Sequence, residues 1–269
     1  IRHWKLWKHN GEVCLDEVKG ARAMASYPSW LIDDHIEWRK IYAEKTSGRL
    51  DVAFNARDAL FYLVRQDKVD ILNGISGNMD KITVEKGYPV MEYTDHLVYD
   101  TLTNQLFSYS LHEKLVSFLS VDERTWSLSE RHLDEPRYYN HARTFNSSDS
   151  SFYFFGGYGF YQYRNDLYRL KVGTKQIEGV TYSPAISPRY SSAAAIVGDE
   201  LYLFGGRGNR QGKQEFNAHF YYELCAINLK TGKSRCVWKK RQSTDILMMA
   251  SSMYFEPSDS SFYAVSMKD

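Results

Sequence analysis

The sequence predicts an all-β protein built from repeated, short antiparallel hairpins. The 269 residues include 21 Tyr, 14 Phe and 6 Trp but only 6 Pro, and aromatic side chains favour strands. Polar turns rich in Gly, Asn and Asp separate short apolar runs along the chain, as in β-hairpins. With 43% hydrophobic and 25% charged residues, the composition is that of an ordinary globular protein.

The clearest internal repeat is a hairpin in which a polar turn joins two apolar strands. Phe145–Phe155 and Phe255–Val265 share the run Ser-Asp-Ser-Ser-Phe-Tyr across this turn. Related segments lie at Val52–Val64, Tyr99–Tyr109, Ala195–Phe204 and, in a weaker form, Leu6–Leu15. A segment that recurs in this way indicates one structural unit used several times.

A second hairpin, often marked by Trp, follows each of the first five. Clear examples are Trp30–Trp38, Val116–Trp126 and Leu224–Trp238. The expected fourth-strand positions are Trp38, Ile82, Trp126, Ile177 and Trp238, spaced by 44, 44, 51 and 61 residues. Four short strands at such a period predict the blade of a β-propeller, in which neighbouring blades bury each other's faces.

The repeats divide the chain, as one domain, into about five and a half four-stranded blades. Their expected bounds are about 1–43, 44–90, 91–135, 136–186 and 187–243, with a partial blade at 244–269 that ends after its second strand. This arithmetic favours a six-bladed ring. A seven-bladed ring, or a piece of a longer protein, is the alternative.

Two of these units carry a sharper pattern. Phe154–Gly157 and Leu203–Gly206 each end a second strand on a double glycine, and Arg137 and Arg189 each follow a proline before the first strand. The pattern resembles the kelch repeat, over about 137–240, and implies a kelch-type β-propeller of the galactose oxidase central domain-like superfamily. The glycines need no ligand to explain them, because the chain must turn sharply where only residues without a Cβ fit easily.

In propellers, ligands usually meet the end of the ring that carries the loops between second and third strands and between blades. The loops Gly157–Asn165 and Gly206–His219 belong to this end and are rich in Tyr and Arg, which give large contact areas at low entropic cost. The expected ligand-binding residues are Tyr158, Tyr161, Tyr163, Arg164, Arg207, Asn209 and Arg210, and the kelch resemblance adds Arg137 and Arg189. They suit a protein partner, a glycan or a small acidic ligand. The alternative is that the loops are only solvated and their Tyr rings pack on neighbouring blades.

The sequence favours binding without catalysis, and we expect no catalytic residue, metal or cofactor. Copper oxidases that resemble galactose oxidase carry an adjacent Tyr-His pair, which this sequence lacks. The alternative function is a sugar-acting enzyme similar to sialic-acid mutarotases. In that case Glu215 or Arg207 would supply the reacting side chain.

Charge and cysteines add further expectations. A net charge of +1 argues against nucleic-acid binding, and no apolar run approaches the roughly 20 residues that span a membrane. Cys225 and Cys236 flank the turn 228–233, so they form either a cross-strand disulfide or two small buried residues. The start at Ile1 and the short last unit lead us to expect an extracytoplasmic location, secreted or periplasmic.

Overall fold

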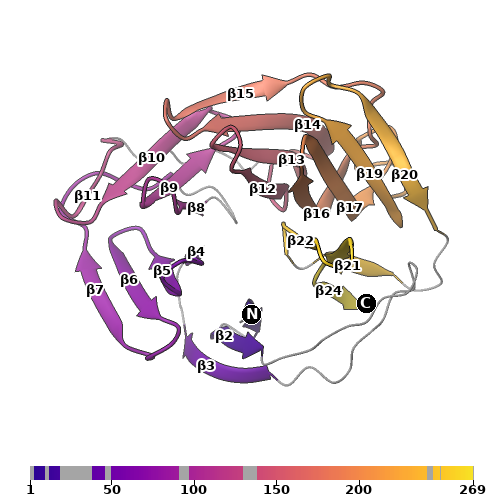
Figure 1. The fold of residues 1–269 in the computed structure, drawn as a ribbon. Coiled ribbons are helices and arrows are strands. Elements are labelled where there is room, and N and C mark those ends of the chain that lie inside the picture. The colour runs from indigo at the N-terminus through magenta and orange to yellow at the C-terminus, as the bar shows by residue number, and fades with distance from the viewer. Residues whose placement is uncertain are drawn as a thin grey trace.

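All regular secondary structure in the described part of the chain is β-strand, as predicted. The computed structural model describes residues 3–9, 12–18, 38–45, 50–90, 97–129, 138–240, 245–248 and 250–268. Figure 1 shows the sheets arranged around a common centre, with β4, β8, β12 and β16 toward the middle and β7, β11, β15 and β20 at the outside. This arrangement is the predicted β-propeller.

Two four-stranded antiparallel sheets follow each other in the first half of the chain. The first contains β4 (Asp51–Asn55), β5 (Leu60–Val64), β6 (Lys68–Asn73) and β7 (Met79–Thr83). The second contains β8 (Leu97–Asp100), β9 (Gln105–Ser110), β10 (Leu115–Ser120) and β11 (Thr125–Trp126). Ile82 in β7 and Trp126 in β11 therefore occupy fourth strands, as the repeat predicts.

The two sheets with the double glycines have longer strands. One contains β12 (Ala142–Asn146), β13 (Ser151–Gly159), β14 (Gln162–Lys171) and β15 (Gln176–Val180). The other contains β16 (Arg189–Val197), β17 (Glu200–Gly208), β19 (Glu223–Asn228) and β20 (Ser234–Lys239), with β18 (His219–Phe220) paired to β17. Ile177 and Trp238 again lie in outermost strands.

The two ends of the chain differ from the predicted units. The first sheet contains β1 (His3–His9), β2 (Glu12–Val18) and β3 (Trp38–Lys45) among the described residues, and Trp38 begins β3, an end strand that pairs with β2. Most of the expected hairpin Trp30–Trp38 lies outside the described residues. The last unit does not end after two strands. It contains β21 (Ile246–Met248), β22 (Tyr254–Glu256), β23 (Ser261–Tyr263) and β24 (Ser266–Lys268), in which β21 pairs with β24 around the predicted β22–β23 hairpin.

The core lies between neighbouring sheets rather than within any one of them. Tyr62 of β5 stacks on Tyr99 of β8, with 4.9 Å between ring centroids, in a cluster that includes Trp126. Phe155 of β13 and Leu203 of β17 belong to another shared cluster. Because each sheet uses both faces in this way, a single unit cannot bury its apolar surface alone.

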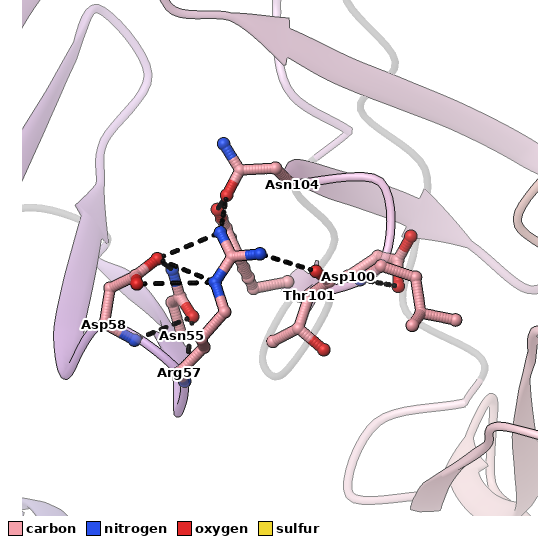
Figure 2. A network of polar contacts seen from close by, with 8 residues as sticks. Asn55, Arg57, Asp58, Asp100, Thr101 and Asn104 are labelled. Carbon is pink, nitrogen blue, oxygen red and sulfur yellow. Dashed lines mark hydrogen bonds and ion pairs between the residues drawn. The ribbon is translucent and has the colours of Figure 1, made fainter.

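Polar contacts also join neighbouring units, as Figure 2 shows for the β4–β5 and β8–β9 turns. Arg57 donates from Nη2 to Asn104 Oδ1 at 2.6 Å and from Nη1 to the Thr101 carbonyl at 3.3 Å. The hydroxyl of Tyr99 donates to the same Asn104 oxygen at 2.6 Å. These bonds connect two turns that lie more than 40 residues apart in the sequence.

The double glycines have the structural role predicted for them. Gly156 and Gly157 adopt φ angles of 69° and 110°, at a register shift in β13. A Cβ on Gly156 would lie 2.4 Å from the Arg189 carbonyl oxygen, and one on Gly157 would lie 2.9 Å from the Tyr138 backbone. The glycines therefore allow β13 to approach both the preceding linker and the next sheet.

Candidate binding face

The β13–β14 hairpin extends beyond its neighbour β15 and ends in an aromatic turn. The last ladder pair is Gly159 with Gln162, so Phe160 and Tyr161 form a two-residue turn. Both have positive φ, 54° and 59°, which is the conformation of a type I′ turn. Phe160 is 50% exposed and Tyr161 is 76% exposed. We call this pair the aromatic turn.

A loop from the next sheet fixes the aromatic turn from the side. Segment 212–214, between β17 and β18, continues the antiparallel ladder through a bridge between Gln162 and Lys213. The Tyr163 N–H donates to the Gly212 carbonyl at 2.7 Å, and the Gln214 N–H donates to the Tyr161 carbonyl at 3.0 Å. We call 212–214 the clamp segment, because its backbone bonds the turn at Tyr161 and the strand that follows it at Tyr163.

Four half-buried tyrosines lie behind the aromatic turn, at the boundary between the two sheets. Tyr163 stacks on Tyr190 of β16, with 5.8 Å between ring centroids and 9° between ring planes. Tyr158 contacts Tyr163 at 5.2 Å, Tyr190 at 5.8 Å and Tyr139 at 5.1 Å. We call these four residues the tyrosine cluster, and the Tyr158 hydroxyl connects it to the clamp segment by donating to Gln214 Oε1.

Arg207 is the cation of this boundary. It lies directly opposite Tyr190 in the β16–β17 ladder, and its guanidinium is 5.3 Å from the Phe220 ring. No carboxylate among the described residues forms an ion pair with Arg207, and its buried Nε has no hydrogen-bond partner there. The half-buried guanidinium therefore carries its charge without a carboxylate partner among the described residues.

Burial and mutual proximity perturb the tyrosines. Burial raises the pKa of Tyr158, and Tyr163, Tyr161 and Tyr190 raise it further. Burial and Tyr190 also raise the pKa of Tyr163, whereas the charge of Arg207 lowers it. Both hydroxyls therefore stay protonated at neutral pH and remain hydrogen-bond donors as well as acceptors.

A shallow hollow of about 540 Å³ opens beside the aromatic turn. Its lining residues are Phe160, Tyr161, Gln162, Lys213, Gln214 and Glu215. Phe216, 42% exposed, extends the aromatic surface along the same loop. The hollow thus combines aromatic surface with amide and charged groups, the mixture found where proteins contact a partner.

The comparisons with known proteins agree with this architecture. A family model described as the KLHDC2/KLHL20/DRC7 Kelch-repeats domain matches residues 90–255. The chain belongs to this kelch-repeat family. The match includes the double glycines, the tyrosine cluster and the clamp segment.

Solved structures add evidence for the fold alone. The structure titled "Structure of YjhT" is similar over 98% of this chain and 93% of that chain, with a TM-score of 0.54 and 10% sequence identity. A search of curated proteins found no match. At this identity the likeness supports the kelch propeller fold and carries no substrate or partner with it.

The kelch propeller brings several of the predicted ligand-binding residues together. Tyr158, Tyr163 and Arg207 meet at one sheet boundary, and Tyr161 lies beside them at the exposed tip. Arg164 belongs to the opposite face of β14, where its guanidinium lies 5.6 Å from the Tyr138 ring. Whether these residues bind a ligand stays a prediction.

The Gly206–His219 loop is more ordered than a solvated loop would be. Asn209 is buried, and its Nδ2 donates to the carbonyls of Lys213 and Phe216 at 2.8 and 3.1 Å. It shapes the loop and presents little surface to a ligand. Arg210 is exposed. Burial lowers the pKa of the His219 imidazole, and the charges of Lys239, Arg189 and Arg210 lower it further.

Arg189 does not lie at the surface, contrary to what the kelch resemblance led us to expect. Its side chain is fully buried and pairs with Glu223, with 2.6 Å between Nη2 and Oε1. It also donates to the carbonyls of Ser187 and Gly205, and its guanidinium lies 3.9 Å from the Tyr221 ring. An arginine so fully bonded supports the fold and cannot contact a ligand. Arg137 lies outside the described residues.

Sequence reasoning missed Tyr139 and Tyr190, half of the tyrosine cluster. A signal was present, since Tyr190 directly follows Arg189 and Tyr139 lies two residues after Arg137. Tyr139 precedes the first strand of its sheet and Tyr190 lies near the start of β16, and only the packing of one sheet on the next brings them to the loops.

The described residues hold no group of three or more His, Cys, Asp or Glu arranged to bind a metal. The same residues contain no helix of the length and hydrophobicity needed to cross a membrane.

Proposed function

We propose that this kelch propeller is a binding module that recognises a segment of a protein partner, without catalysing a reaction. The contact surface is the aromatic turn, the hollow beside it and the tyrosine cluster with Arg207. The observation that carries the proposal is the aromatic turn itself.

The aromatic turn costs free energy that folding does not require. Type I′ turns are normally Asn-Gly or Gly-Gly, because both central residues must adopt positive φ. For a bulky side chain this conformation costs roughly 1–2 kcal/mol per residue. Tyr161 is also 76% exposed, so burial of its ring does not offset the strain. A strained turn that presents aromatic rings to solvent is typical of a contact site rather than of a connection.

The surroundings of the turn suit a partner protein with some acidic character. Lys213 lines the hollow, with Glu215 3.6 Å away, and Arg207 lies beside the tyrosine cluster, opposite Tyr190, without an ion pair among the described carboxylates. Aromatic rings with nearby Arg are the commonest anchors of protein interfaces. The clamp segment fixes the turn before binding, which lowers the entropic cost of association.

The acidic side chains favour binding over sugar chemistry. A general acid at neutral pH needs a carboxyl group whose pKa is raised. Every described Asp or Glu for which a shift is resolved has a lowered pKa, because hydrogen bonds and cations stabilise the carboxylate. Glu215, the carboxylate nearest the hollow, is exposed and paired with Lys213. The mutarotase-like alternative therefore has no observation in its favour at this site.

The test is a selection from a phage-displayed random peptide library on the wild type and on a Phe160→Asn/Tyr161→Gly variant. This variant keeps the turn conformation and removes both rings. We expect peptides that bind the wild type and lose at least tenfold in affinity on the variant. Leu102→Ala is the matched control. Leu102 is 59% exposed and lies in the β8–β9 turn of another sheet, which joins a first to a second strand, whereas the aromatic turn joins a second to a third strand.

Two results would overturn the proposal. One is peptides that bind both proteins equally well, which would place the contact elsewhere. The other is a glycan array on which Tyr161-dependent binding occurs while no peptide is selected, which would replace the protein partner by a carbohydrate.

A further inference from the structure

Two free thiols face each other at the outer edge of the β16–β20 sheet. Cys225 of β19 and Cys236 of β20 are direct partners in the antiparallel ladder, and neither is bonded. Directly opposed residues in such a ladder have Cα atoms about 4.5–5.5 Å apart. Natural disulfides join Cα atoms about 4.4–6.8 Å apart, so this register places the two cysteines within bonding range.

The local backbone gives the pair room to adjust. The register shifts between Leu224 and Cys225, so that Val237 has no ladder partner. Such a bulge increases the local twist and loosens the ladder beside it. β20 is also the outermost strand of its sheet, with no strand paired on its other side in the described ladder.

The two thiols differ sharply in environment. Cys225 is 4% exposed, and its Sγ lies 3.8 Å from Glu223 Oε1, whereas Cys236 is exposed. Burial raises the pKa of Cys225 to about 12; the charge of Arg189 opposes this rise and Glu223 adds to it. Cys225 is therefore protonated and inaccessible at neutral pH, and a reagent in solution meets Cys236 first.

We propose that Cys236 and Cys225 form a reactive thiol pair that small-molecule disulfides convert into a cross-strand disulfide, with Cys236 reacting first. The Cys236 thiolate attacks one sulfur of glutathione disulfide, forms a mixed disulfide and releases one glutathione thiolate. The Cys225 thiol then loses its proton to that thiolate or to water, and its sulfur attacks Cys236 Sγ. This step breaks the mixed disulfide and releases the second glutathione, so two cysteines are oxidised and one glutathione disulfide is reduced.

The environments also order the rates of the two steps. Because the resolving sulfur is buried and mostly protonated, the second step is slower than the first, and the mixed disulfide at Cys236 appears as a transient. The final bond joins β20 covalently to β19 and covers no part of the aromatic turn. The proposal is independent of the function proposed above.

The test follows the folded, reduced protein in glutathione disulfide by intact mass and by peptide mapping. In the wild type we expect one glutathione to be added and then lost, leaving a protein short of two hydrogens with Cys225 bonded to Cys236. Cys225→Ser, with Cys225→Ala as a second variant, should stop at the glutathione adduct. Cys236→Ser should leave Cys225 unmodified. All proteins compared, including the reference, carry Cys14→Ser, so that only Cys225 and Cys236 can take up glutathione.

Unfolding supplies the control for the role of the structure. In urea, burial no longer protects Cys225, so Cys236→Ser should then take up glutathione at Cys225 as fast as Cys225→Ser does at Cys236. The proposal fails if Cys225 reacts in folded Cys236→Ser, or if the wild type retains the adduct without forming the internal bond. It also fails if the order of reaction is the same in urea as in the folded protein.

Discussion

At one end of the sheets the turns are held by a side chain from the strand before them, whereas at the other end one turn is a strained pair of aromatic residues. The carboxylate of Asp100 accepts the Leu102 N–H at Oδ1 and the Thr103 N–H at Oδ2, at 3.1 and 2.9 Å. Equivalent bonds are made by Asn55, Asn73, Asn146 and Asn228, each at the end of a first or third strand. We call these the capped turns.

The capped turns and the aromatic turn meet different requirements. A capped turn satisfies backbone N–H groups with a short polar side chain, which favours the correct hairpin locally. The aromatic turn has two positive φ angles without Gly or Asn and depends on the clamp segment of another sheet. Capped turns also hold a non-glycine residue at positive φ, such as Ala59 or Ser150, but only one each, whereas the aromatic turn has two in succession. The difference teaches that the aromatic turn is the more strained of the two kinds and that its shape depends on a neighbouring sheet.

The largest expected effect separates two arginines near the aromatic turn: Arg189, which is buried and paired, and Arg207, which has no ion pair among the described residues. Arg189→Ala should lower the free energy of unfolding by about 3–5 kcal/mol, because it removes the buried partner of Glu223 and leaves that carboxylate only the exposed Lys239. Arg207→Ala should lower it by no more than about 1 kcal/mol, since no described carboxylate pairs with Arg207. Urea unfolding measures the free energy of unfolding of both variants. Equal losses would contradict the view that Arg189 supports the fold and Arg207 does not.

The next effect has the opposite sign. Phe160→Asn/Tyr161→Gly should raise the free energy of unfolding by about 1–3 kcal/mol, because Asn-Gly adopts the same turn without strain. The midpoint of thermal unfolding should rise accordingly. A loss of stability would mean that the two rings contribute more to packing than their exposure indicates, and the contrast between the two ends would disappear.

A capped turn should respond as an ordinary folding element. Asp100→Ala should lower the free energy of unfolding by about 1 kcal/mol, because two backbone N–H groups and the Thr103 hydroxyl lose their acceptor. Asp100→Asn keeps an oxygen in the same place and should lose less. If Asp100→Ala is as stable as the wild type by urea unfolding, the caps are incidental.

The smallest expected effect is a pH dependence of the free energy of unfolding that comes from Glu223. Burial alone would raise the pKa of Glu223, but the hydrogen bond and charge of Arg189, together with Lys239, hold it below its ordinary value. The folded protein therefore binds fewer protons at this site than the unfolded chain. The resulting stability is fully present above the ordinary glutamate pKa and is lost as the pH falls through the folded value.

Urea unfolding between pH 7 and pH 3 of the wild type and of Glu223→Gln isolates this contribution. The wild type should lose more stability than the variant over that range. Parallel curves for the two proteins would show that Glu223 does not contribute, because the remaining carboxylates are common to both.

The sequence was sufficient for features that depend on neighbouring residues. Hairpins such as Phe145–Phe155 were predicted because apolar runs and turn residues lie within one short segment. The cross-strand register of Cys225 and Cys236 followed from the turn between them. The burial of Arg189 did not follow, because its partner Glu223 lies 34 residues away and its position depends on how β16 packs beside β19.

The candidate site was predicted only in part for the same reason. Tyr158, Tyr161 and Tyr163 were found because they share one loop. Tyr190 reaches them only across a boundary between sheets, and Asn209 turns inward to bond the carbonyls of its own loop. Composition identifies a loop that is rich in binding residues, but the packing of sheets decides which of them face solvent.

Because of the clamp segment, the shape of the aromatic turn depends on two neighbouring sheets rather than on one. The clamp segment is residues 212–214 of the β16–β20 sheet, whereas the aromatic turn belongs to the β12–β15 sheet. A hairpin cut out as a peptide, or grafted alone onto another propeller, would therefore lose its support and its shape. We expect that the smallest unit that can be exchanged between proteins with this surface intact is the pair of adjacent sheets from β12 to β20.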